Sequence, residues 1–65
     1  MKTVYLEERV INGDYYTVIT IGNKTMYAYE GKYIKSFPFK DEFDMTVDFY
    51  RHKKGWRVVV IDNFS

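Results

Sequence analysis

The Asn12-Gly13 pair constrains this chain most strongly, because it stands between two runs in which apolar and polar residues alternate. Both residue types tolerate the positive φ angles of a type I′ turn, whose twist matches that of two paired strands. We therefore expect an antiparallel hairpin formed by residues 3–11 and 15–21. Its register pairs Val10 with Tyr15, Glu8 with Thr17, Leu6 with Ile19, and Val4 with Ile21. Turn chemistry and the hydrophobic pattern independently select this register.

A second turn at Gly22-Asn23 extends the sheet to residues 25–30. Its register places Met26 opposite Ile19 and Ala28 opposite Thr17. Gly31 belongs either to a two-residue loop or to a three-residue loop with a bulge, and the sequence leaves this choice open. A fourth short run follows at residues 33–37.

The segment 43–52 has two interpretations. As a strand, its apolar residues fall on alternate positions: Phe43, Met45, Val47 and Phe49. As a helix near residues 41–54, it has acidic residues at its start, basic residues at its end and Gly55 as a cap. The helix would leave Met45 and Phe49 opposite the remaining apolar residues. We therefore favour the strand.

Residues 56–62 form the last predicted strand, in which Arg57 is followed by four β-branched aliphatic residues. Such a run is typical of a strand that is covered on both faces. The sequence therefore predicts an all-β fold with five or six short antiparallel strands in a meander, a curled sheet or a small barrel. The alternative is an α+β fold in which a helix near residues 41–54 packs on the sheet.

The chain has 65 residues, which suffices for one small domain over residues 1–65. A domain of this size removes only about 60% of its unfolded surface from water, so its core is thin. The chain contains no cysteine and therefore no disulfide. It also lacks an apolar run long enough to cross a bilayer, and its start does not resemble a signal segment. We therefore expect a cytoplasmic protein without a membrane partner.

Tyrosines supply the clearest functional signal. Four of them share the predicted sheet face opposite Leu6, together with two charged residues: Tyr5, Tyr16, Tyr27, Tyr29, Glu7 and Arg9. Tyrosine provides a large apolar area at low rotamer cost and a hydroxyl that bonds with a partner or with water. This pattern predicts a surface that binds another protein or a second copy of the chain. The alternative, which the sequence leaves open, is that a closed barrel buries these rings as a second core.

Basic and aromatic residues near the last predicted turn indicate a second kind of site. The residues are Arg51, Lys53, Lys54 and Arg57, with Tyr50 and Trp56 beside them. Such a group could hold nucleic-acid phosphates while bases stack on the rings. The net charge of only +1 argues against this interpretation, because nucleic-acid-binding domains carry a basic excess.

Catalytic and metal-binding patterns are missing from the sequence. The acidic residues Asp41, Glu42, Asp44 and Asp48 do not have the spacing of a calcium loop, and His52 has no nucleophile to activate. We therefore expect a non-enzymatic binding protein without a cofactor or metal, of a kind typical of accessory and inhibitor proteins of mobile elements. The alternative function is that of a small β-barrel that binds single-stranded nucleic acid.

Overall fold

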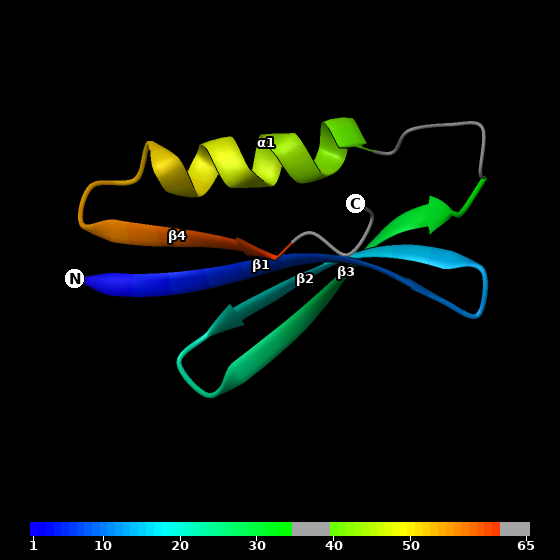
Figure 1. Cartoon of the computed structure of the whole chain (residues 1–65), viewed down its shortest axis with the longest axis horizontal. Coiled ribbons are helices and arrows are strands. Elements are labelled where there is room, and N and C mark those ends of the chain that lie inside the picture. The colour runs from blue at the N-terminus through cyan, green and yellow to red at the C-terminus, as the bar shows by residue number, and fades with distance from the viewer. Residues whose placement is uncertain (35–39, 62–65) are drawn as a thin grey trace.

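The computed structural model describes residues 1–34 and 40–61, with the side chains of all of these except Lys40 and Asp41. Within this part of the chain, four strands and one helix occur in the order β1 (Lys2–Ile11), β2 (Asp14–Ile21), β3 (Lys24–Lys32), α1 (Lys40–Arg51) and β4 (Trp56–Ile61). The strands form a single open sheet in the order β3-β2-β1-β4. Figure 1 shows this twisted sheet with α1 along one of its faces.

The two predicted hairpins are confirmed in their registers. Val10 pairs with Tyr15 and Leu6 with Ile19 between β1 and β2, and Ile19 pairs with Met26 between β2 and β3. At the first turn Asn12 has a φ of 52° and Gly13 a φ of 79°, as a type I′ turn requires. The turn residues and the hydrophobic alternation therefore determine the first three strands.

Gly31 lies in neither of the two loops considered for it from the sequence. It lies inside β3 with a φ of 121°, opposite Tyr15, where the pairing of β2 with β3 shifts by one residue. The extra residue is Glu30, because Tyr16 pairs with Tyr29. Gly31 is thus part of a β-bulge, a position that favours a residue without a Cβ. Of the fourth predicted run, Tyr33 and Ile34 are not in a strand, and residues 35–37 lie outside the described residues.

The predicted strand at residues 43–52 is wrong, because residues 43–51 belong to α1, as in the alternative α+β fold. Phe43 and Val47 face the sheet and are buried, whereas Met45 is 71% and Phe49 61% exposed. The period-two pattern misled the prediction because it treated all the apolar residues as one buried face. A helix of this length needs only one apolar stripe to pack, and the other apolar side chains can remain in water.

The last strand also differs from its prediction. β4 lies at an edge of the sheet and pairs parallel with β1, from Lys2 opposite Trp56 to Glu7 opposite Ile61. The described residues do not cover it on both faces, and Val60 and Ile61 are about two-fifths exposed. The parallel direction follows from α1, since the helix carries the chain back across the molecule before β4 begins (Figure 1). In the described residues, a mixed, open sheet of four strands with one helix therefore replaces the expected all-antiparallel meander or barrel of five or six strands.

The core lies between α1 and the face of the sheet that contains Val4 and Leu6. These two residues of β1 are fully buried against Phe43 and Val47. Partly buried apolar residues surround this centre: Ile19, Ile21, Tyr50, Trp56 and Val58. Alternate residues of β1 therefore point into the core, and the residues between them point to the other face.

Substitutions on α1 distinguish its two apolar sides. We expect Val47→Asp to lower the free energy of unfolding by more than about 3 kcal/mol, because it buries a carboxylate without a partner. Met45→Asp, on the exposed side, should change this free energy by no more than about 0.5 kcal/mol. Urea unfolding followed by circular dichroism measures both. Equal losses in the two variants would contradict the helix, because only a strand places residues 45 and 47 on the same face.

Candidate functional site

The sheet face opposite α1 is not covered by any element in the described part of the chain. Its side chains come from the alternate positions of β1, β2 and β3 that do not enter the core. The register aligns Arg9, Tyr16 and Tyr29 in one row across the strands, and Glu7, Val18 and Tyr27 in the next. Tyr5 belongs to the same face, opposite Thr20. We call the surface formed by Tyr5, Tyr16, Tyr27, Tyr29, Glu7 and Arg9 the tyrosine face.

All six residues predicted for this surface therefore lie on the same side of the sheet. Tyr5, Tyr27 and Tyr29 are 44–58% exposed, and Tyr16 is half-buried. The barrel that would have closed over these rings does not form in the described residues, because the sheet remains open. The rings are thus separate from the core under α1.

Tyr16 holds two of its neighbours through edge-on ring contacts. Its ring centroid lies 6.2 Å from that of Tyr27, with the planes at 87°, and 5.6 Å from that of Tyr29, at 63°. This geometry is favourable because the positive edge of one ring meets the negative face of the other. Val18, which lies beside Tyr27 in the register, is 4% exposed although it belongs to the uncovered face. Tyr16, Tyr27 and Tyr29 consequently form an ordered aromatic cluster.

Tyr29 also makes a long hydrogen bond to Asp14 of the neighbouring strand. The Tyr29 hydroxyl donates to Oδ1 of Asp14 at 3.4 Å. Partial desolvation and the negative charge of Asp14 raise the pKa of Tyr29 above its ordinary value. A tyrosine phenol is protonated at neutral pH even at its ordinary pKa, so it can donate this hydrogen bond.

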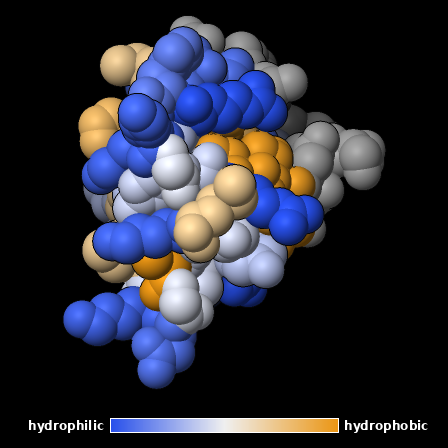
Figure 2. All heavy atoms as spheres, turned by 90° about the vertical axis from the view of Figure 1, so that its left-hand side faces the viewer, coloured by the Kyte–Doolittle hydropathy of each residue, from blue (hydrophilic) through white to orange (hydrophobic). Residues whose placement is uncertain are grey.

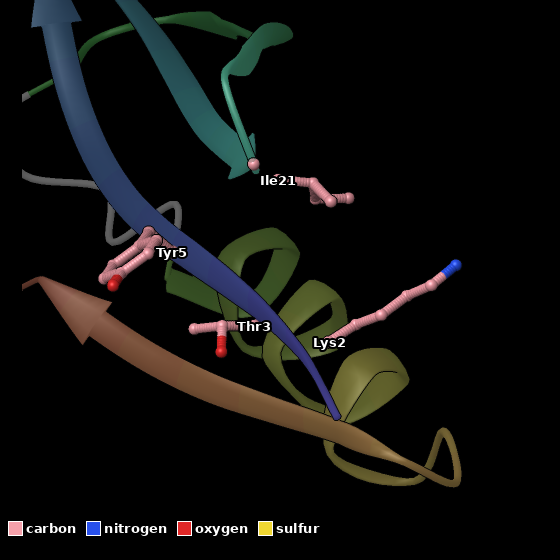
Figure 3. A pocket seen from close by; sticks show the side chains of 5 residues that line it. Lys2, Thr3, Tyr5 and Ile21 are labelled. Atoms are coloured by element: carbon pink, nitrogen blue, oxygen red, sulfur yellow. The ribbon is translucent and has the colours of Figure 1, made fainter.

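A shallow depression of about 370 Å³ lies where β1 extends past the end of β2, and it is lined by Lys2, Thr3, Tyr5, Ile21 and Gly22. Figure 3 shows Tyr5 and Thr3 pointing to one side of β1, and Lys2 and Ile21 pointing to the other. The side chains do not converge on a common point. The depression is thus an open notch at the rim of the tyrosine face, without the convergent polar groups of a small-molecule pocket.

The residues predicted for nucleic-acid binding do not form one surface. Trp56 lies in the α1-covered face, where it packs against the core, whereas the neighbouring Arg57 points to the tyrosine face. Arg51, Lys53 and Lys54 are exposed at the end of α1 and in the turn that follows. Figure 2 views this end of the molecule and shows hydrophilic atoms in separate groups with hydrophobic atoms between them.

The two aromatic rings of this set already have partners within the chain. The ring centroids of Tyr50 and Trp56 are 5.3 Å apart. The ammonium groups of Lys53 and Lys2 lie 5.1 Å and 5.5 Å from the Trp56 centroid. These cation–π contacts tie the start of β1 and the end of α1 to β4. A base that stacked on Trp56 would have to displace them.

A buried polar group on the α1 side of the sheet was not identified as a site from the sequence. The Tyr15 hydroxyl donates to Glu8, and burial and this contact raise the pKa of Tyr15. Thr17, opposite Glu8 in the register, is fully buried. The signal was present, since Glu8 and Thr17 are the polar members of the otherwise apolar hairpin face.

The pKa of the bulge residue Glu30 is raised above its ordinary value, first by burial and then by the negative charge of Glu42. The folded protein therefore holds this proton more tightly than the unfolded chain does. It follows that the contribution of Glu30 to stability is greatest at low pH and is lost as the pH rises through the folded-state pKa.

Glu30→Gln should accordingly raise the free energy of unfolding at pH 7, by up to about 1 kcal/mol because the side chain is only partly buried. The gain should disappear near pH 4, where the wild-type carboxyl is protonated. Urea unfolding at the two pH values measures it, with Glu30→Asp as the control that keeps the charge. If Gln and Asp have the same effect at pH 7, the charge of Glu30 is not destabilising.

Residues 1–34 and 40–61 contain neither a metal-binding cluster nor a membrane-spanning helix. Among them, no three His, Asp or Glu side chains lie close enough together to bind a metal ion. Glu42, Asp44 and Asp48 are exposed on α1. The helix in this part of the chain has neither the length nor the apolar character needed to cross a membrane.

Comparisons with protein-family models, with curated proteins and with solved structures found no match to this chain. A function can therefore be inferred only from the chemistry of the chain's own surfaces.

Proposed function

We propose that this chain is a cytoplasmic, non-enzymatic binding protein that contacts another protein through the tyrosine face. The observation that carries the proposal is that half-exposed tyrosine rings lie on a sheet face that no element in the described part of the chain covers. Tyr5, Tyr27 and Tyr29 remain in water although a separate core exists under α1. A partner that removed these rings from water would gain the large apolar area that makes tyrosine a frequent binding hot spot.

The ring contacts support the proposal because they reduce the entropy cost of binding. Tyr16 packs edge-on against both Tyr27 and Tyr29, and Asp14 accepts a hydrogen bond from Tyr29. Side chains that are already ordered lose little rotamer freedom when a partner docks on them. Their hydroxyls can also bond with polar groups of the partner.

The charges on this side of the sheet favour a protein over a nucleic acid. Glu7 and Asp14 are acidic, and Arg9, Lys32 and Arg57 are basic, so these five residues carry a net charge of only +1. A nucleic-acid surface needs an excess of positive charge to neutralise phosphates. Mixed charges around aromatic rings instead suit a protein partner with complementary charges.

A pull-down with paired variants tests the proposal. The wild-type protein is immobilised and incubated with nuclease-treated extract of the cells that encode it, and the retained proteins are quantified by mass spectrometry. We expect Tyr27→Ser/Tyr29→Ser to reduce the retention of the specific partner at least about tenfold, because each truncated hot spot costs about 1 kcal/mol or more.

The matched control is Met45→Ser/Phe49→Ser, which removes two comparably exposed apolar side chains from α1. This variant should retain the partner at the wild-type level, and circular dichroism verifies that both variants fold. Equal retention by the two double variants would overturn the proposal. So would a partner that the wild-type protein retains from untreated extract but not from nuclease-treated extract.

A further inference from the structure

The two edges of the sheet differ in their protection against pairing with another strand. β3 forms one edge and carries a bulge at Glu30 and Gly31, with Lys24 and Lys32 at its ends. Bulges and charged residues are common means of keeping an edge strand unpaired. β4 forms the other edge, and its register with β1 is regular over its whole length.

β4 lacks these protective features. Within the described residues, β1 is the only strand that pairs with β4, so the outer edge of β4 presents backbone N–H and C=O groups to its surroundings. Its sequence contains no proline and only one charged residue, Arg57, before a run of four aliphatic residues. Val60 and Ile61 are about two-fifths exposed. An edge with this composition is suited to accept a further strand.

We propose that the outer edge of β4 pairs antiparallel with β4 of a second copy of this chain. Two identical strands on a two-fold axis pair antiparallel, because the same surface serves both partners. The side chains of directly opposed residues must point to the same face of the sheet. The axis must therefore lie between two copies of the same residue, so that this residue opposes itself. An axis between the two copies of Val59 keeps residues 57–61 of both copies paired.

This register is complementary on both faces of the joined sheet. On the α1 side it places Val58 opposite Val60 of the second copy, and aliphatic side chains meet. On the other face it places Arg57 opposite Ile61 of the second copy. Within that copy, Ile61 pairs with Glu7 of β1. Arg57 of each copy thus approaches an acidic side chain of the other, and the contact occurs twice because of the symmetry.

The two α1 helices would lie beside each other across the axis. α1 packs over Val58 of the edge strand as well as over Val4 and Leu6 of β1, and it lies closer to β4 than to β1. Two such helices would lie on either side of the axis and on the same face of an eight-stranded sheet. Both tyrosine faces would lie together on the opposite side. Five paired residues bury less area than a standard stable interface, so we expect an affinity in the micromolar range.

Single cysteines provide a direct geometric test, since the chain contains none of its own. In the proposed dimer residue 59 faces itself, and opposed residues of antiparallel strands have Cα atoms about 4.5–5.5 Å apart, within the range of a disulfide. Val59→Cys should therefore form a covalent dimer under mild oxidation at least about tenfold faster than two controls. The controls are Thr25→Cys on the β3 edge and Phe49→Cys on α1. Comparable rates in all three variants would overturn the proposal.

The self-association of chains without introduced cysteines tests the register independently. Sedimentation equilibrium should show the mass rising toward that of two chains between about 10 µM and 1 mM. Ile61→Lys, which opposes Arg57 of the second copy, should weaken association at least about tenfold, and adding Arg57→Glu should restore it. A wild-type protein that is monomeric at about 1 mM, or a double variant as weak as Ile61→Lys, would refute the proposed pairing.

Discussion

A sheet has two faces, and the described part of this chain contains one helix with which to cover them. α1 packs on the face that contains Val4 and Leu6, and this contact forms the core. Successive side chains along a strand point to opposite faces of the sheet. The neighbours of every strand residue that lies under α1 therefore point to the other face. The position of the helix therefore determines which side chains remain in contact with water.

The chemistry of the exposed face follows from that assignment. In β1 to β3, the positions facing away from α1 carry tyrosines together with Glu7 and Arg9. A domain with a thin core gains little by leaving so many rings in water. The edge-on contacts of Tyr16 keep part of this aromatic area ordered without burying it. The tyrosine face is thus separate from the core in position and ordered before any partner arrives.

The sequence was most informative where short-range chemistry decides the structure. Asn12-Gly13 determined the first hairpin, and strand alternation then identified the tyrosine face. The helix was considered but ranked below the strand, because Met45 and Phe49, both largely exposed, completed a strand-like pattern. β4 was misplaced because its aliphatic run resembles that of a buried strand, although it lies at an edge. In both cases tertiary contacts, which local patterns do not encode, decided between alternatives of similar local preference.

Hydroxyl-radical footprinting with mass spectrometry tests most directly whether the two sheet faces differ in this way, because side-chain oxidation follows exposure to solvent. We expect rapid oxidation of Tyr27 and Tyr29, which are more than half exposed, and protection of Tyr15, which is 2% exposed on the α1 side. Protection of Tyr15 should be lost on unfolding in urea. Equal protection of all three rings in the native protein would place the tyrosines in a common buried core and would exclude a separate tyrosine face.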